Sequence, residues 1–389
     1  MAEAAFDPQR FAAPAVRVQR RADGALQWRS HQRLPAADVS SVGQWLLRWA
    51  AGRPDQTFLA ESDGPTEWRR LSYAQALDQV RRVAQGLLDR GLNGDRPVLI
   101  LSGNGIDHAV IALAAMHVGV PVVPVSTAYS LLSQDHAKLR AIVRRVGPGL
   151  VYAADPVAYG RALQAIGWAS TRYEDLCAGE VSPAVDAAFA ALTPDTVAKI
   201  LFTSGSTGEP KGVINTQRML TVNQQQSLAV WRFVAQEPPV VLDWLPWGHT
   251  FGGNYNFNLV LSNGGTMYID GGKPVPGVFE TTLRNLREVA PTMYFNVPRG
   301  FELLLPELER DADLCRHFFS RCSFVFYAAA DLPQNLWDRL VHLARCAGRE
   351  DLAIVSSWGS TETAPLSCAV HYPVDRAGVV GLPVTFRTS

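Results

Sequence analysis

The chain has 389 residues, of which 47% are hydrophobic and 19% charged, and its 36 basic side chains balance its 36 acidic ones. That length suffices for two or three sub-domains with sizeable cores, and the composition is ordinary for a globular protein. A formal net charge of zero argues against bulk attraction to nucleic acid or to an anionic membrane.

The cysteines and the apolar segments point to a cytoplasmic protein. None of the five cysteines belongs to a Cys-x-x-Cys pair, which is typical of reduced thiols in the cytosol. Cys315, His317 and Cys322 are close in sequence, but a buried helix face explains them better than a metal site. Residues 1–35 lack the apolar core of a signal peptide, and the longest apolar stretch, 109–125, is too short and too interrupted to span a bilayer.

The first half of the chain alternates between helical and extended patterns. Residues 1–39 are expected to form an irregular N-terminal arm, followed by a first α/β sub-domain over 40–192. Ser72 is a plausible N-cap of an amphipathic helix that Gly91 would end. Residues 167–192 are expected to be a connecting region. Further elements are predicted as a capped helix after 40–41, strand 97–102, helix 106–118, strand 120–125, helix 133–146 and strand 149–154.

The same alternation continues through residues 193–389, which we expect to form a second α/β sub-domain. An apolar run at 197–202 predicts a buried strand. Strands that alternate with helices predict an α/β fold of parallel sheets sandwiched by helices, with ligands at the carboxyl ends of the strands. The remaining elements are helices 217–234, 253–261, 279–289, 301–319 and 334–347, and strands 240–245, 266–269, 292–297, 323–328 and 352–356.

The segment 203–212, Thr-Ser-Gly-Ser-Thr-Gly-Glu-Pro-Lys-Gly, has the chemistry of a phosphate-binding loop. Its glycines let backbone N–H groups turn towards a ligand, its hydroxyls add donors, and Lys211 adds a mobile positive charge. It is not a Walker-type loop, because Pro210 stands where the second glycine should be. Composition alone favours a flexible surface turn.

As a whole, this ten-residue segment resembles the phosphate-binding loop of the adenylate-forming enzymes, which include acyl-CoA synthetases, peptide-synthetase adenylation domains and luciferases. The resemblance runs from about residue 28 to about residue 383 and implies the large N-terminal domain of that family. It implies that Ser204, Ser206, Thr207 and Lys211 hold the β- and γ-phosphates of ATP. The loop residues expected to bind the nucleotide are Thr203, Ser204, Gly205, Ser206, Thr207, Gly208 and Lys211.

A second segment, 356–363, follows a predicted strand and carries an isolated glutamate. Alone, a glutamate after a Gly-Ser-Thr turn is most simply a helix-capping residue. The sequence is similar to the family pattern aromatic-Gly-x-Thr-Glu, which implies that Trp358 packs on adenine, Thr361 touches phosphate and Glu362 holds Mg²⁺. Mg²⁺ usually takes one or two carboxylates beside phosphate and water. The expected nucleotide contacts here are Trp358, Gly359, Ser360 and Thr361.

The segment 243–254 contains a histidine that would most often be structural on general grounds. The resemblance implies instead that His249 lies beside the acyl carboxylate, with two glycines making room for the substrate, and that His249, Thr361 and Glu362 are catalytic. Residues 326–332 resemble the small-residue segment that lines the adenine and acyl pocket, although three alanines also suit tight helix packing. The expected pocket residues are Ala328, Ala329 and Ala330 for adenine, and Trp247, His249, Phe251, Gly252, Gly253, Asn254, Phe295, Val297 and Tyr327 for the acid.

Within the family, residues 213–220, 243–254 and 294–298 look most like feruloyl-CoA synthetases, which activate hydroxycinnamic acids; Gly248 departs from an expected asparagine. The implied reaction activates a carboxylic acid with ATP and Mg²⁺ and passes the acyl group to coenzyme A. Such a chain can form a homodimer, whereas no nucleic-acid partner and no membrane span are expected.

The end of the chain departs from the family, since residues 385–389 lack an expected Pro-Gly step. The resemblance implies a ribose-binding aspartate and a mobile C-terminal domain beyond this point, so we expect a truncated chain with impaired turnover. The alternatives are a catalytically incomplete ATP- and acid-binding protein and an acyl-CoA synthetase for fatty acids. A serine hydrolase lacks its Gly-x-Ser-x-Gly elbow, and His108 interrupts the one start of a dinucleotide-binding Gly-x-Gly-x-x-Gly.

Overall fold

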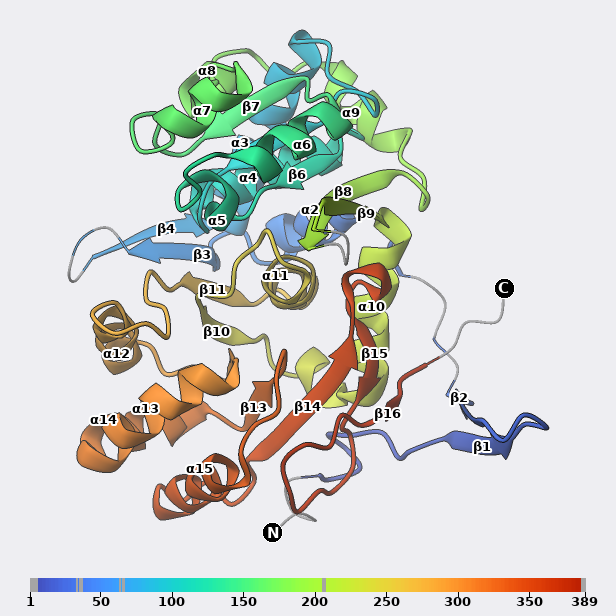
Figure 1. The fold of residues 1–389 in the computed structure, drawn as a ribbon, viewed down its shortest axis with the longest axis vertical. Coiled ribbons are helices and arrows are strands. Elements are labelled where there is room, and N and C mark those ends of the chain that lie inside the picture. Colours follow the sequence, from blue (N-terminus) through green and yellow to red (C-terminus); the bar gives the residue numbers. More distant parts are fainter. Residues whose placement is uncertain are drawn as a thin grey trace.

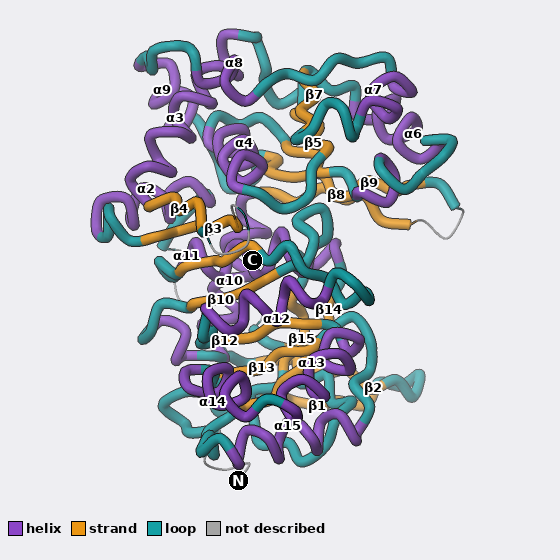
Figure 2. The backbone as a smooth tube through the Cα atoms, turned by 90° about the vertical axis from the view of Figure 1, so that its left-hand side faces the viewer, coloured by secondary structure: helices purple, strands orange, loops and turns teal. Residues whose placement is uncertain are grey.

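The computed structural model describes residues 6–32, 34, 38–62, 64, 67–204 and 208–385. Within these ranges the protein is an α/β fold with three main sheets that follow one another along its long axis (Figures 1 and 2). The predicted fold class is therefore confirmed, although each sheet also contains antiparallel pairs or strands that the sequence patterns missed.

The first sheet has the strand order β7-β5-β6-β8-β9 and lies among helices from the first half of the chain (Figure 1). Its first four strands are parallel, and β9 returns antiparallel to β8. The strands are β5 (Val98–Leu101), β6 (Val122–Pro124), β7 (Leu150–Ala153), β8 (Val197–Ser204) and β9 (Pro210–Thr216). The helices are α2 (Val42–Gly52), α3 (Tyr73–Asp89), α4 (Ile106–His117), α5 (Thr127–Ser130), α6 (Ala137–Val146), α7 (Gly160–Ile166), α8 (Tyr173–Cys177) and α9 (Pro183–Ala190).

The middle sheet, β10-β11-β3-β4, joins strands from both halves of the chain. Here β3 (Thr57–Ser62) pairs in parallel with β11 (Thr266–Ile269) and antiparallel with β4 (Trp68–Ser72), while β10 (Val240–Asp243) forms the other edge. The first sheet likewise combines β5, β6 and β7 with β8 and β9. The predicted sub-domain boundary between residues 192 and 193 therefore divides two sheets, each of which contains strands from both sides of it.

The third sheet, β12-β13-β14-β15-β16, carries the C-terminal half. Strands β12, β13 and β14 are parallel, and β15 and β16 add an antiparallel edge. The strands are β12 (Met293–Asn296), β13 (Phe324–Tyr327), β14 (Ala353–Gly359), β15 (Leu366–Ala369) and β16 (Leu382–Pro383). The helices of this half are α10 (Gln217–Val230), η1 (Arg232–Ala235), α11 (Phe257–Ser262), α12 (Phe279–Glu288), α13 (Pro298–Arg310), α14 (Ala312–Arg321) and α15 (Gln334–Cys346).

Three predicted helices in the C-terminal half differ in the structure. The helix predicted over 217–234 is α10 followed by the separate 3₁₀ helix η1. The helix predicted over 301–319 is two helices, because Asp311 ends α13 and its carboxylate accepts the N–H groups of Asp313 and Leu314 at the start of α14. The helix predicted over 253–261 begins earlier as a π-helix, η2 (Thr250–Asn256), and continues as α11.

The N-terminal region shows one correction and one confirmation. The arm predicted as irregular contains a hairpin of β1 (Val16–Arg20) and β2 (Leu26–Ser30). Helix α3 begins as predicted, since Ser72 accepts the N–H of Gln75 and the Gln75 side chain accepts the N–H of Ser72. The predicted stop, Gly91, has a φ of +67°, which glycine adopts at little cost.

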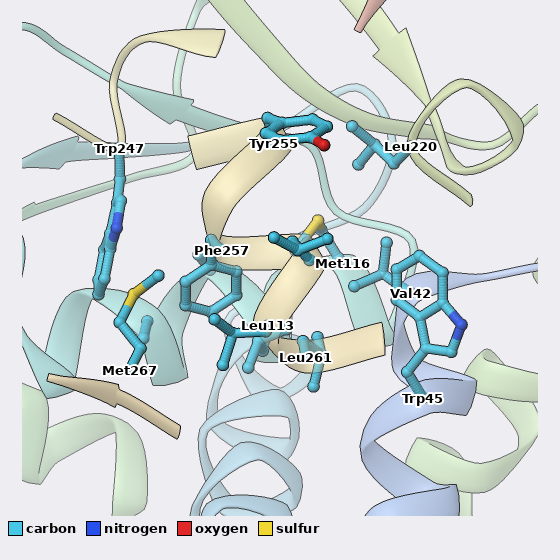
Figure 3. Packing of buried hydrophobic residues seen from close by; sticks show 14 of the residues in the cluster. Val42, Trp45, Leu113, Met116, Leu220, Trp247, Tyr255, Phe257, Leu261 and Met267 are labelled. Atoms are coloured by element: carbon cyan, nitrogen blue, oxygen red, sulfur yellow. The ribbon is translucent and has the colours of Figure 1, made fainter. Parts of the chain in front are cut away.

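The main core lies where α11 passes between α2, α4 and α10. Helices α4 and α11 are buried on almost all sides, as their mainly apolar sequences would suggest. None of the described helices is long and apolar enough to cross a membrane. Residues shown packing together in Figure 3 are Val42, Trp45, Leu113, Met116, Leu220, Trp247, Tyr255, Phe257, Leu261 and Met267.

Candidate active site

Two cavities meet at the turn that precedes the π-helix. The Trp358 cavity has a volume of about 350 Å³ and lies between the carboxyl ends of β13 and β14 and the π-helix. The Lys273 cavity has a volume of about 730 Å³ and is lined by strand ends of the first and middle sheets. His249, Thr250, Phe251 and Ala329 line both cavities, so this turn forms their common wall.

His249 is held in one tautomer by the backbone of the π-helix. Its Nδ1 accepts the N–H of Phe251 at 3.3 Å, which leaves the proton of the neutral ring on Nε2. Surrounding protein partly desolvates the ring and lowers its pKa below the ordinary value, so the imidazole is neutral at pH 7. A neutral Nε2–H at the shared wall can donate to a carboxylate oxygen without adding charge.

Trp358 offers an aromatic face at the edge of the cavity named after it. Its side chain is 56% exposed although the first four residues of its strand, β14, are buried, which is unusual for so large an apolar ring. The next residue must be glycine, because a Cβ at Gly359 would lie 1.8 Å from the carbonyl oxygen of Pro365. This close approach lies next to Trp358, where the register of β14 and β15 shifts.

Glu362 lies on the short turn η3 (Thr361–Thr363) and is exposed. Its own backbone N–H, the Ser360 side chain and the nearby charge of Lys211 lower the pKa of its carboxyl group, so it is ionised at neutral pH. In the described ranges no group of three or more His, Cys, Asp or Glu side chains could hold a metal ion. A single carboxylate does fit Mg²⁺, which takes most of its ligands from phosphate and water.

The predicted phosphate loop connects β8 and β9. Thr203 pairs with Lys211 and Ser204 pairs with Pro210 across the hairpin, and Thr203 and Ser204 line the Lys273 cavity. Gly208 has a φ of +85°, a conformation that favours glycine. The predicted phosphate contacts Gly205, Ser206 and Thr207 lie outside the described residues.

The alanine segment after β13 turns its backbone towards the same region. Ala328, Ala329 and Ala330 line the Trp358 cavity, and Ala329 has a φ of +75°, which is uncommon outside glycine. Tyr327 lines the cavity too, and its hydroxyl accepts the N–H of Gly378 at 3.0 Å. This bond attaches the segment before β16 to the cavity wall.

The comparisons with known proteins agree with this geometry. The sequence profile of the AMP-binding enzyme family matches residues 46–388, which is most of the chain. The chain belongs to the AMP-binding enzyme family. The resemblance read from the sequence is thereby confirmed at the level of the family.

Relatives of this AMP-binding enzyme include several CoA ligases. It is 28% identical over 330 residues to a 4-chlorobenzoate–CoA ligase of Arthrobacter sp., covering 82% of this chain and 58% of the relative. It is 27% identical over 360 residues to an indoleacetate–CoA ligase of Aromatoleum aromaticum, covering 87% and 64%. A carboxylic acid reductase of Mycobacterium marinum is 25% identical over 282 residues, covering 62% and 23%. The chain thus spans less than two thirds of the length of each of these relatives.

Solved structures with the same fold are more distant in sequence. The complex of VinN with L-aspartate has a TM-score of 0.70 at 21% identity, covering 88% of this chain and 82% of that one. Apo MatB from Rhodopseudomonas palustris has a TM-score of 0.67 at 22% identity, covering 89% and 64%. At these identities the likeness concerns the fold alone.

Four residues predicted to contact the acid lie elsewhere in this AMP-binding enzyme. Phe295 is buried in an aromatic cluster with Phe324 and Phe326 and does not line either cavity. Gly252 and Gly253 do not make room for a substrate, because a Cβ on either would lie about 2 Å from the carbonyl oxygen of Leu245 or Trp247. Asn254 is fully buried and bonds to other side chains.

The other predicted acid contacts face the cavities. Phe251 lines both, Trp247 and Val297 line the Lys273 cavity, and Tyr327 lines the Trp358 cavity. Tyr255 and Phe326 also form walls of the Trp358 cavity. Neither is among the predicted acid contacts, although Phe326 begins the segment 326–332 that the motif places at the pocket. Their positions depend on the π-helix and on the packing of β13, neither of which a local pattern reveals.

Proposed function

We propose that this chain binds ATP and a carboxylic acid, joins them as an acyl-adenylate, and passes the acyl group to the thiol of coenzyme A. One observation carries the proposal: a neutral His249 stands at the wall shared by two cavities, with Trp358 on one of them and the phosphate loop on the other. Family membership and the relatives named as CoA ligases support it.

The residues of the chain position the reactants and neutralise charge. A carboxylate oxygen of the acid, held by the Nε2–H of His249, attacks the α-phosphorus of ATP, and pyrophosphate leaves. The thiol of coenzyme A then attacks the acyl carbonyl, and AMP leaves. The chain supplies no nucleophile, so positioning and electrostatics carry the rate. One such electrostatic contact is typically worth about 3 kcal/mol of barrier.

The proposed nucleotide contacts follow from where the side chains lie. The exposed face of Trp358 can stack on adenine, and Ala328–Ala330 border the same cavity. Thr361 lines the Lys273 cavity, as does Ser204 of the phosphate loop. Lys211 lies close enough to Glu362 to lower its pKa, so a phosphate and a Mg²⁺ ion would each find a charge of opposite sign here. Mg²⁺ held by Glu362 would neutralise phosphate charge.

An aromatic acid, ferulate or a related hydroxycinnamate or aryl acid, is the substrate class that we propose. The Trp358 cavity has aromatic walls from Phe251, Tyr255 and Phe326, which suit a planar ring. The 4-chlorobenzoate and indoleacetate ligases among the relatives are named for aromatic acids. A fatty acid is the alternative, since a putative fatty-acid–CoA ligase of Mycobacterium leprae is 29% identical over 234 residues.

Thermal unfolding of the chain with ligands tests this function. We expect ATP with Mg²⁺ to raise the Tm, and ferulate or 4-chlorobenzoate to raise it further only when the nucleotide is present. A ligand at a hundred times its Kd stabilises by about 2.7 kcal/mol, which is readily measured. If ATP does not shift the Tm, the proposed function is refuted. If hexanoate and octanoate shift the Tm and the aryl acids do not, the substrate class is fatty acids.

Assembly and location stay predictions from the sequence. Light scattering during size-exclusion chromatography tests a homodimer, and cell fractionation tests a cytoplasmic location.

A further inference from the structure

A buried cross-strand pair supports the π-helix that follows His249. Lys199 on β8 and Asn215 on β9 are register partners, and they are 5% and 0% exposed. The Nζ of Lys199 donates to the carbonyl oxygen of Gly253 at 2.7 Å, and the Oδ1 of Asn215 accepts from the Nδ2 of Asn254 at 2.9 Å. The two strands that carry the phosphate loop therefore hold two consecutive residues of the π-helix.

The amide of Asn215 also holds the turn that carries Glu362. Its Nδ2 donates to the carbonyl oxygen of Thr361 at 3.0 Å, while the same Asn254 amide donates to Thr250 Oγ1 at 3.1 Å. Thr250 follows His249 directly and lines both cavities. Two buried side chains, Asn215 and Asn254, thus connect the His249 turn with the Thr361–Glu362 turn, behind the wall of the cavities.

Burial of a lysine without an acidic partner lowers the free energy of unfolding, so stability alone does not explain this arrangement. Lys199 forms no ion pair with any described acidic side chain, and burial lowers its pKa from 10.5 to about 8. The nearby ring of His108 on α4 carries no charge either, because burial lowers its pKa to about 4. An apolar side chain of similar size is often no less stabilising than a buried charge. Buried polar groups that are fully hydrogen-bonded instead favour a single arrangement of the segments that they join.

We propose that Lys199 and Asn215 are positioning residues that fix His249 relative to Thr361 and Glu362, and that they thereby couple the binding of nucleotide to the binding of the acid. This inference rests on the proposed function. A nucleotide that orders the Thr361 turn orders the Asn215 amide, which in turn holds the π-helix behind His249. Each ligand then binds more tightly when the other is present.

Calorimetric titrations of the whole chain test the coupling without requiring turnover. The nucleotide probe is ATP with a methylene group between the α- and β-phosphates, and the acid probe is whichever of ferulate, 4-chlorobenzoate and hexanoate shifts the Tm most. For the wild type, we expect the acid to bind at least about fivefold more tightly with the nucleotide, the lower end of typical coupling. In Asn215→Leu this ratio should fall below about twofold, while nucleotide alone binds within about threefold of wild type.

A matched control separates positioning from stability. Asn263→Leu makes the same change at a buried asparagine that bonds a backbone carbonyl and lines neither cavity. It should lower the Tm but keep the wild-type ratio. If Asn215→Leu does not fold, Lys199→Met serves instead, because it removes the bond to Gly253, leaves the Asn215 bonds in place and should reduce the ratio in part.

The outcomes distinguish this inference from the function on which it rests. A wild-type chain that binds no nucleotide and no acid refutes both. A wild type that binds nucleotide but shows a ratio of one, or a folded Asn215→Leu or Lys199→Met with an unchanged ratio, overturns only the coupling.

Discussion

Single residues in this protein are placed by contacts with distant backbone segments. Gly359 owes its identity to the carbonyl of Pro365, and Glu362 owes its low pKa to its own backbone N–H, Ser360 and Lys211. Neither effect requires a catalytic role, yet they leave Trp358 on the wall of one cavity and an ionised carboxylate next to Thr361, which lies on the wall of the other. At this scale the proposed chemistry can be tested with minimal changes of side chain.

Replacing Glu362 by Gln should reduce adenylate formation by about a hundredfold or more, because it removes the charge that would hold Mg²⁺ and keeps the shape. ATP-dependent formation of acyl-hydroxamate measures the rate. Glu280→Gln, at an exposed glutamate on α12, is the control and should change nothing. Pyrophosphate release at the wild-type rate in Glu362→Gln would contradict the assignment of Glu362 as the ligand of Mg²⁺.

Gly359→Ala should destabilise the fold by several kcal/mol or displace the Trp358 segment, because its Cβ would overlap the backbone of Pro365. The comparison is Gly52→Ala at the end of α2, where a Cβ meets nothing within 4 Å. Urea unfolding should show Gly52→Ala unchanged or stabilised by up to about 1 kcal/mol. Equal behaviour of the two variants would contradict the role given to the close approach.

At the scale of elements, the π-helix is the feature that the local pattern missed. Its apolar residues read as an ordinary helix from 253, whereas the observed element begins at Thr250 and turns His249 into its N-cap. π-helical turns occur often at functional sites. Helix α3, by contrast, needs no such context, since its start is encoded by Ser72 and Gln75.

Ser72→Ala should therefore cost about 1 kcal/mol of unfolding free energy, the usual loss for a capping side chain. Ser41→Ala makes the same change at the N-cap of α2, where the side chain forms no capping bond, and should cost less. Chemical denaturation followed by circular dichroism measures both. A loss in Ser41→Ala as large as in Ser72→Ala would show that the cap is not the cause.

At the scale of the whole molecule, the sheets combine strands from both halves of the chain. Strands β8 and β9 complete the first sheet, and β3 pairs with β11, so the cavities are built at joints between segments far apart in sequence. Lys199 on β8 is buried within this assembly of strands and helices, so the free energy of desolvating it is lost from the stability of the whole fold.

That cost predicts a pH dependence of stability. The pKa of Lys199 is about 8 in the folded protein and 10.5 as its ordinary value, so between these pH values the unfolded chain binds more protons. The free energy of unfolding of the wild type should therefore rise, relative to Lys199→Met, from pH 8 to about pH 10.5, at up to about 1.4 kcal/mol per pH unit. Below pH 8 the difference should be constant. A flat difference across the whole range would show that Lys199 is not desolvated.

Short-range periodicity and contiguous motifs such as 203–212 and 356–363 suffice to predict the α/β class, most strands and helices, and the family. The tertiary structure alone decided which motif residues reach the cavities, that Phe295 and Asn254 do not, and that Lys199 and Asn215 lie behind the wall. The Asn215–Thr361 bond joins residues 146 positions apart, and such a contact follows from packing and strand register rather than from any local pattern.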